Sequence, residues 1–283
     1  MSYKIILLHA GGLLATDFSA QAQELGWRLQ SIDCSQSAMP DLDKEHISVI
    51  YDLVDSPLAE PSVYDRLMSE VYSLAAERQV PLVQLSSYKL AQEPVEGDFD
   101  ESYLANAFVG SYWSERESRA LDLKRYVCLR ASWILNDGQA ALFSSLVSRI
   151  IASDPSLCVS DHRYGGPIST AFIASVLVSL QQQIVCGAEN WGLFHLHSAD
   201  VCSEAEFCDQ LVRQLSKELD REFDLPAVAG ADDMRALYQA DANVLGRRIT
   251  DCFGIQLPTW RRGFGSLLRA WLHENGYAKT IEG

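Results

Sequence analysis

Short apolar runs alternate with helical segments along the first third of the sequence, and this rhythm restricts the fold more than any other feature does. Each run is too short for a helix and is bounded by turn residues, as buried strands are. The expected strands are Tyr3–Leu8, Arg28–Asp33, Ile47–Val54 and Val80–Ser86. Helical patterns lie at Ala15–Leu25 and Ser62–Gln79. Strand–helix–strand order builds βαβ units with right-handed crossovers, so we predict an α/β fold with a doubly wound parallel sheet.

The later part of the chain continues this pattern and then adds a second unit. Further strands are expected at Tyr126–Trp133, Leu157–Ser160 and Leu193–His197, and further helices at Gly110–Leu123, Leu142–Ile151, Thr170–Gln183, after a Ser203 capping box and at Trp260–Asn275. We predict a Rossmann-like, NAD(P)-binding-type domain over residues 1–155 and a smaller C-terminal α/β substrate lobe over 156–283. Segments around 157–200 are expected to return to the first domain, and residues 93–107 form a long polar loop.

Charge and composition exclude several classes of protein. The net charge of −15 and the pI near 4.7 argue against binding to nucleic acid or to an anionic membrane. No apolar run approaches the length of a membrane span, and the N-terminus lacks signal-peptide features, so we expect a cytoplasmic location. The seven cysteines are scattered and contain no C-x-x-C pair, which is typical of a reducing compartment. We therefore predict no metal site.

The turn after the first strand is where a Rossmann-like domain binds the phosphates of a dinucleotide. Its sequence, HAGGLLA, keeps Gly11 and Gly12 but has His9 where the fingerprint has its first glycine. Asp33 ends the second strand, where an acidic side chain can bind the adenosine ribose. These residues are equally compatible with an NAD(P) site and with a plain turn that binds nothing.

Side chains that suit carbonyl reduction gather after the fourth strand and on the helix that follows. Ser86 and Ser87 close the strand, and Tyr112 and Arg116 lie four residues apart, on one face of the helix. Tyr112 would donate a proton to a carbonyl oxygen held by Ser86 or Ser87. Arg116 would stabilise the phenolate, although an arginine cannot join a lysine-type proton relay because it does not lose its proton. Tyr88 is a further phenol nearby.

A structural interpretation of the same helix competes with the catalytic one, and we favour it over intact catalysis. Glu115, Arg116, Glu117 and Arg119 have the spacing of intrahelical ion pairs on a solvent-exposed face. In that case the helix carries no chemistry.

Two further patterns are weak. His195 and His197 share one face of an expected strand, but no carboxylate or cysteine completes a metal-ligand set nearby, so core or hinge histidines are expected. Serine hydrolase chemistry has no support, because no G-x-S-x-G motif occurs.

Five stretches follow one another in an order that matches a known family. They are LVQLSSY at 82–88, LRASWIL at 129–135, VSDHRYGGPIST at 159–170, GLFHLHSADVCSEAEF at 192–207 and FGIQLPTWRRGF at 253–264. With them the chain resembles the dTDP-4-dehydrorhamnose reductases, which are extended short-chain dehydrogenases. The resemblance implies a Rossmann domain for NAD(P), with Tyr88 on the cofactor side, and a smaller lobe for a nucleotide-sugar. By the same match, Arg130 and Trp133 would line the sugar side, and Asp161 would lie in the turn that links the lobes.

The chain departs from the family pattern in the parts that carry chemistry. The Asn-Ala-Ala after the third strand reads Asp52-Leu53-Val54, and the lysine of Tyr-x-x-x-Lys is replaced by Arg116. A second register, aligned on Gly110 and Glu117, puts Val109 and Trp113 at the two catalytic places and has no chemistry at all.

These departures spare the residues expected to form the core. Our first hypothesis is a catalytically impaired relative that binds a nucleotide, a nucleotide-sugar or a protein partner, as the regulatory β subunit of methionine adenosyltransferase does within the same family. The alternative is an active NAD(P)H-dependent reductase of a nucleotide-sugar that uses Tyr112 and Arg116. A third hypothesis is an oligomeric structural component, which would expose a large apolar patch.

Overall fold

A computed structural model of the chain describes residues 4–35, 46–54, 61–88, 112–135, 142–229 and 246–277. The expected polar loop at 93–107 lies outside these residues, as does Val109. The description therefore covers the expected strands apart from Tyr3 and the greater part of every expected helix.

A six-stranded parallel sheet forms the larger lobe, with the strand order β2-β1-β3-β4-β5-β8. The strands are β1 (Lys4–His9), β2 (Arg28–Asp33), β3 (Ile47–Asp52), β4 (Leu82–Ser87), β5 (Tyr126–Ala131) and β8 (Gly192–Leu196). The residues of β1, β3, β4, β5 and β8 are largely buried on both faces, which explains the continuous apolar runs there. The edge strand β2 is mostly part-exposed. The predicted Rossmann-like, doubly wound parallel sheet is confirmed.

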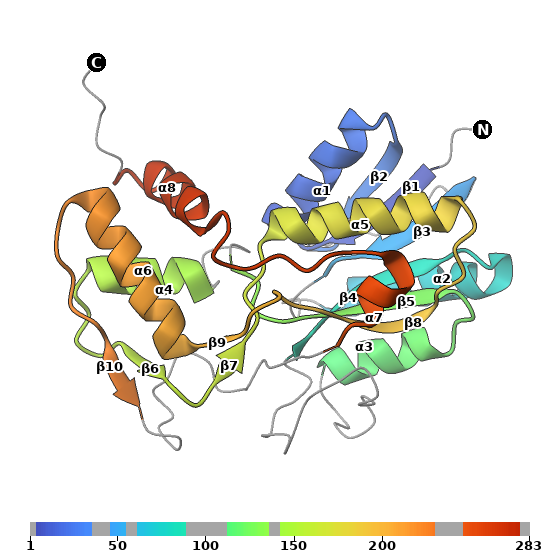
Figure 1. Cartoon of the computed structure of the whole chain (residues 1–283). Coiled ribbons are helices and arrows are strands. Elements are labelled where there is room, and N and C mark those ends of the chain that lie inside the picture. Colours follow the sequence, from blue (N-terminus) through green and yellow to red (C-terminus); the bar gives the residue numbers. More distant parts are fainter. Residues whose placement is uncertain are drawn as a thin grey trace.

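Helices cover both faces of this sheet (Figure 1). On one face lie α1 (Leu13–Glu24) and α5 (Thr170–Val185), which pack on each other as well as on the strands. On the other face lie α2 (Pro61–Arg78) and α3 (Tyr112–Leu121). The helix that follows β1 thus lies on one face of the sheet, and the helices that follow β3 and β4 lie on the other, as in a doubly wound sheet.

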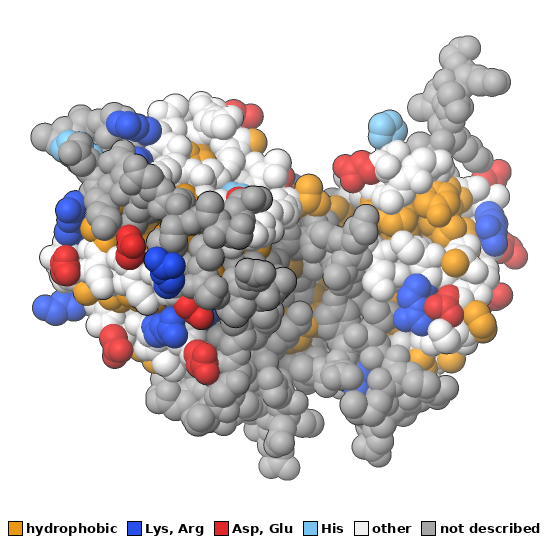
Figure 2. Space-filling model, turned by 180° about the vertical axis from the view of Figure 1, so that it is seen from behind, with side chains coloured by type: hydrophobic (Ala, Val, Ile, Leu, Met, Phe, Trp, Pro, Cys, Tyr) orange, Lys and Arg blue, Asp and Glu red, His pale blue; other side chains and the backbone are white. Residues whose placement is uncertain are grey.

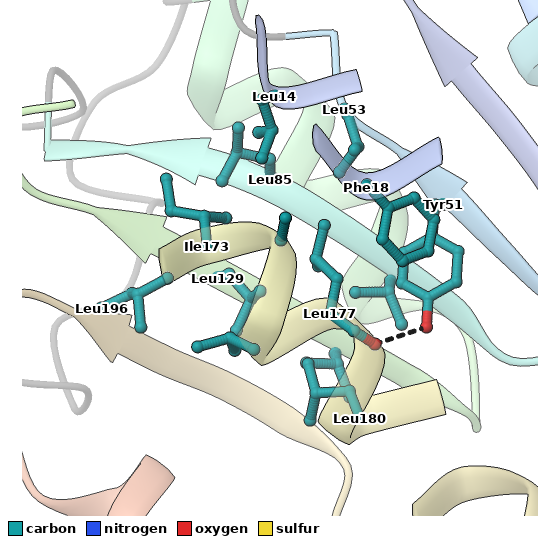
Figure 3. Packing of buried hydrophobic residues seen from close by; sticks show 14 of the residues in the cluster. Leu14, Phe18, Tyr51, Leu53, Leu85, Leu129, Ile173, Leu177, Leu180 and Leu196 are labelled. Carbon is teal, nitrogen blue, oxygen red and sulfur yellow. Dashed lines mark hydrogen bonds between the residues drawn. The ribbon is translucent and has the colours of Figure 1, made fainter. Parts of the chain in front are cut away.

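The core between α1, α5 and the sheet is built from interlocking side chains (Figure 3). Phe18 of α1 lies against Tyr51 of β3, with ring centroids 4.8 Å apart. The Tyr51 hydroxyl donates to the carbonyl oxygen of Leu177 over 3.1 Å, so the one polar atom of this ring is satisfied inside the core. Burial of a polar group of this kind is tolerated only when it is hydrogen-bonded.

The smaller lobe has a separate hydrophobic core. The helices that enclose it are α4 (Leu142–Ile151), α6 (Glu204–Leu219) and α8 (Phe264–Glu274). Phe207 lies at its centre, with its ring centroid 5.3 Å from that of Trp260 and 5.4 Å from that of Phe264. Aromatic rings packed in this way stabilise the lobe beyond the contribution of their buried area.

Two short sheets complete the smaller lobe and its junction with the larger one. In the first, β6 (Cys158–Ser160) pairs in parallel with β10 (Ala227–Ala229); in the second, β7 (Tyr164–Gly165) pairs antiparallel with β9 (Cys202–Ser203). The predicted capping box begins α6: the Glu206 N–H donates to the Ser203 hydroxyl, and the Ser203 N–H donates to the Glu206 carboxylate.

The chain passes between the lobes more than once. Helix α4 packs in the core of the smaller lobe, and the chain then returns to the sheet through α5 and β8. A short helix that the sequence did not predict, α7 (Arg248–Phe253), also packs on the sheet, with Ile249 and Phe253 in the core on the α1 and α5 side. Each lobe is thus built from separated segments of the sequence.

Two differences from the expected elements have local causes. The last helix begins at Phe264 and not at Trp260, because Gly263 at its N-cap has φ 87° and the residues before it form a turn. The strands β7, β9 and β10 are too short to leave a period-two pattern. Among the described helices, none is long and apolar enough to cross a membrane.

Candidate functional site

The carboxyl ends of the sheet strands face the smaller lobe (Figure 1). The chain passes from the sheet to the smaller lobe at this edge: Trp133 follows β5 by two residues and is already part of the core of the smaller lobe. In open α/β sheets, ligands bind outside the carboxyl ends of the strands, so this edge is the place to look for a site.

The β1–α1 turn has the backbone geometry of a phosphate-binding turn but an unusual side chain. Gly11 and Gly12 have φ values of 87° and 90°, which an L-residue with a side chain rarely adopts. The Gly11 N–H donates to Nδ1 of His9 over 2.9 Å, and Nε2 of His9 lies 2.8 Å from the Ser31 hydroxyl. Because Nδ1 accepts a hydrogen bond, the neutral ring carries its hydrogen on Nε2.

The surroundings of His9 favour this neutral form. Partial burial lowers the pKa of the His9 imidazole below its usual value, and the Asp33 carboxylate offsets part of that effect. Asp33 itself closes an Asx turn at the end of β2: its Oδ1 accepts from the Ser35 N–H at 3.0 Å and from the Ser35 hydroxyl at 2.7 Å. The Cys34 N–H donates to the His9 carbonyl oxygen over 2.7 Å, which ties the ends of β1 and β2 together.

A buried ion pair joins α3 to the end of β3. Arg116 Nη2 donates to Asp52 Oδ2 over 2.7 Å, and Arg116 Nη1 donates to the carbonyl oxygen of Val54. The same carboxylate oxygen accepts from the Tyr64 hydroxyl at 3.0 Å and from Gln84 Nε2 at 3.2 Å. Asp52 is fully buried and Arg116 is 6% exposed, so the charges neutralise each other out of contact with water.

A second buried ion pair lies beside the first and joins α3 to β4 and β5. Arg130 Nη2 donates to Glu117 Oε2 over 2.8 Å, and Arg130 Nε donates to Glu117 Oε1 over 3.0 Å, a bidentate arrangement. The Ser86 hydroxyl donates to the same Glu117 Oε1 over 2.5 Å. The structure therefore brings together Arg116 and Ser86, two of the residues predicted for catalysis, and Arg130, predicted for substrate, within one buried polar layer.

The surface-helix interpretation of α3 is wrong. Arg116 and Glu117 are 6% and 2% exposed, and their ion-pair partners lie on β3 and β5, not on the helix itself. Glu115 and Arg119 do face solvent. The signal in the sequence was Asp52, an acid at the end of an apolar strand, where the resemblance would place an asparagine.

The other predicted site residues are distributed around this edge. Ser87 is half-buried, whereas Tyr88 and Trp133 belong to the core of the smaller lobe. Asp161 is about half exposed, and its Oδ1 lies 3.2 Å from His162 Nε2; none of its described contacts joins it to the polar layer. Tyr112 is the first residue of α3, and its side chain lies outside the described part of the structure.

Trp133 is held in place by a glycine. A Cβ atom added to Gly165 would lie 2.4 Å from the Trp133 ring, so no other residue fits at that position without displacing the indole. Trp133 is also 1% exposed. The predicted contact of Trp133 with a sugar stays a prediction.

His195 in β8 and His197 just after it are buried, as expected for core or hinge residues. His195 is fully buried. His197 has Nδ1 2.7 Å from the Ser198 carbonyl oxygen and Nε2 3.1 Å from that of Gly246, so it links β8 to the segment that leads into α7. Within the described residues, no group of three or more His, Cys, Asp or Glu side chains is arranged to hold a metal ion.

A cavity of about 720 Å³ opens between the lobes. Its lining comes from the first turns of α1 and from α4 and α8: Leu13, Asp17, Phe143, Ser144, Ser148, Leu267, Ala270, Trp271, Glu274 and Asn275. A smaller cavity of about 240 Å³ shares Leu267 and runs past the start of α5. Seen from behind, the molecule is hollowed between the two lobes (Figure 2). Space for a ligand therefore exists beside the carboxyl edge of the sheet.

Comparison with known proteins matches this architecture. Residues 59–272 match the family model described as the RmlD substrate binding domain. A search of curated proteins finds no match.

Solved structures give full-length matches at low sequence identity. A dTDP-4-dehydrorhamnose reductase from Bacillus anthracis, in complex with NADP, has a TM-score of 0.71 and 14% identity over 95% of this chain and 99% of that one. The same enzyme from Clostridium acetobutylicum has a TM-score of 0.70 and 14% identity, covering 94% and 98%. A dTDP-glucose 4,6-dehydratase from B. anthracis, in complex with NAD, has a TM-score of 0.66 and 13% identity, covering 96% and 97%. At these identities the structures show a shared fold.

Proposed function

Because the chain belongs to the RmlD substrate binding domain family, we propose that it binds a sugar nucleotide in the cleft between its lobes but is impaired in reducing it. In this role the protein acts as a binding or regulatory relative of the reductases. Family membership supports the sugar-nucleotide part of the proposal. The impairment rests on the residues at the carboxyl edge of the sheet.

The observation that carries the proposal is the ion pair between Arg116 and Asp52. A catalytic tyrosine needs a cation nearby that favours its phenolate and helps to move its proton. Arg116 is the cation at the right spacing from Tyr112, but its charge is balanced by a fully buried carboxylate 2.7 Å away. A neutralised arginine supplies little of that electrostatic help, and it cannot pass on a proton.

Ser86 is engaged in a similar way. Its hydroxyl donates its hydrogen to the Glu117 carboxylate over 2.5 Å, a short, charge-assisted bond. To hold a substrate carbonyl oxygen, the serine would have to give up this bond and leave a buried carboxylate with one donor fewer. Ser87, which is half-buried, is better placed for that task.

The residues of the turn fit a dinucleotide poorly. Relatives with this fold contain NADP or NAD, and the positive φ angles of Gly11 and Gly12 suit a phosphate turn. However, His9 occupies the place of the first glycine and binds the Gly11 N–H, and Asp33 Oδ1 accepts two hydrogen bonds from Ser35. The turn is therefore a poor binding site for NAD(P)H.

A turnover assay tests the proposal directly. Purified protein is incubated with NADPH and dTDP-4-dehydrorhamnose, and NADPH oxidation is followed together with that of Tyr112→Phe. We expect the two rates to be equal and at background. Calorimetry with a dTDP-sugar on the same protein is expected to show binding.

The matched control is Tyr164→Phe, which removes the hydroxyl of an exposed tyrosine on the smaller lobe. Turnover that is lost in Tyr112→Phe but kept in Tyr164→Phe would establish the alternative, an active NAD(P)H-dependent reductase. Absence of both turnover and dTDP-sugar binding would refute the sugar-nucleotide role and direct attention to a protein partner.

A further inference from the structure

The His9 imidazole bridges two chain segments that a dinucleotide would have to approach. Nδ1 accepts from the Gly11 N–H in the β1–α1 turn, and Nε2 donates to the Ser31 hydroxyl on β2. The β1–β2 register places Leu7 opposite Ser31 and His9 opposite Asp33, so the ring lies along the gap between the two strand ends. In Rossmann folds, the adenosine of the cofactor is bound between this turn and the end of β2.

Several polar groups at this corner are already engaged with one another. The Gly11 N–H is used by His9, the Cys34 N–H is used by the His9 carbonyl oxygen, and Asp33 Oδ1 accepts from both donors of Ser35. A dinucleotide that approached the Gly11 N–H would have to replace its bond to His9 and also displace a part-buried ring. An exchange of one hydrogen bond for another yields little net free energy, and a displaced ring adds a cost.

We propose that His9 closes the adenosine end of the cofactor site and excludes NAD(P)H from this chain. The inter-lobe cavity, lined by α1, α4 and α8, does not include His9 and stays open to another ligand. This inference refines the proposed function by naming the residue that separates sugar-nucleotide binding from dinucleotide binding. It depends on binding alone, so it can fail while the proposal on catalysis holds.

The test is calorimetric titration of the full chain with NADPH and with NADH. His9→Gly restores the glycine of the fingerprint and frees the Gly11 N–H. We expect it to bind at least one dinucleotide more tightly than the unsubstituted protein by about tenfold or more, which corresponds to about 1.4 kcal/mol. His9→Ala also removes the ring and is expected to show a smaller gain.

His9→Phe is the matched control, because it keeps a ring of similar size and removes both ring nitrogens. If the ring excludes the ligand by its bulk, His9→Phe stays as weak a binder as the unsubstituted protein. Ser31→Ala removes one of the two anchors of the imidazole and leaves the turn itself unchanged, and we expect a gain smaller than that of His9→Ala. Circular dichroism and thermal unfolding identify any variant that has lost its fold.

The proposal is overturned if the unsubstituted protein binds NADPH or NADH as tightly as folded His9→Gly does. It is also overturned if folded His9→Gly binds neither dinucleotide more tightly than the unsubstituted protein does. Neither result concerns turnover. If the unsubstituted protein and Tyr112→Phe both show only background turnover, the proposed function stands even when the His9 proposal is overturned. NADPH oxidation by the unsubstituted protein would end both proposals.

Discussion

The carboxyl edge of the sheet is stabilised by different kinds of interaction at its two ends. At the β1–β2 end, hydrogen bonds join neutral groups of His9, Gly11 and Ser31 near the surface. At the β3–β5 end, two ion pairs fasten α3 to the strands with almost no exposure to water. We expect that changing one side chain, that of His9, opens the first end. At the second end we expect no single substitution to restore function, because each removal leaves a buried charge without its partner.

This contrast predicts how function could be regained. Binding of a dinucleotide should respond to one substitution at His9. Catalysis should not respond to one substitution at Arg116, because Asp52 and its other donors stay behind. The following predictions test the contrast, from the largest expected effect to the smallest.

Replacement of Glu117 by alanine should have the largest effect on stability. It leaves the Arg130 guanidinium buried without its carboxylate, and breaking a buried pair in this way typically costs about 3–5 kcal/mol. Urea denaturation gives the free energy of unfolding. Glu115→Ala, at an exposed position two residues earlier on the same helix, is expected to change it by less than about 0.5 kcal/mol.

The double replacement Glu117→Met with Arg130→Leu distinguishes the destabilisation caused by an unpaired buried charge from that caused by lost packing. Because no charge is left unpaired, the double variant should be more stable than Glu117→Ala. If instead the double variant is as unstable as Glu117→Ala, shape and not charge dominates this layer, and the contrast between the two ends is wrong.

Arg116→Ala should destabilise the protein less than Glu117→Ala does, by about 2–4 kcal/mol. The reason is that Asp52 keeps hydrogen bonds from Tyr64, Gln84 and the Val54 N–H, whereas Arg116 supplies only part of its solvation. The same denaturation experiment measures it. A loss larger than that of Glu117→Ala would show that the β3 pair, and not the β5 pair, holds α3.

Arg116→Lys restores the lysine of the family motif and tests whether the cation alone limits catalysis. We expect no turnover of NADPH with dTDP-4-dehydrorhamnose, because Asp52 remains to neutralise the new ammonium group. The assay described for Tyr112→Phe applies. Turnover by Arg116→Lys would show that the buried pair does not impair the site.

The smallest expected effect is a pH dependence that comes from His9. Burial lowers the pKa of this imidazole in the folded protein, so the unfolded chain binds a proton first as the pH falls through about 6.5. The stability contributed by the neutral ring is therefore complete above that pH and is lost as the pH falls through the lower, folded-state pKa. NMR titration of the imidazole, with His9→Ala to assign the signal, checks the direction. A His9 resonance that titrates above 6.5 would contradict the prediction.

Local features of the fold could be predicted because neighbouring residues produce them. The apolar runs marked the strands of the sheet, and Ser203 with Glu206 marked the start of α6, since a capping box spans only four residues. Gly11 and Gly12, which the sequence placed in the turn after the first strand, have positive φ angles that glycine adopts readily. Helix α7 was not predicted because it is too short to show a helical period of its own.

The polar layer could not be predicted in the same way. Asp52 and Arg116 are 64 residues apart, and Glu117 and Arg130 are 13 apart on different elements. The spacing of the charged residues on α3 suits intrahelical ion pairs equally well, and the helix periodicity does not indicate which of them face the sheet. Only the packing of α3 across β3, β4 and β5 selects the partners.

The sequence by itself determined that this chain folds as a doubly wound parallel sheet, and it identified the family through motifs that keep their order. Those properties depend on periodicity and on short stretches, which act within a few residues. The tertiary structure alone decided that Arg116 is neutralised by Asp52, that Ser86 donates to Glu117, and that His9 is hydrogen-bonded to Ser31 on β2. These contacts join segments that meet only after the sheet has formed, and a buried charge takes whichever partner the packing brings within reach.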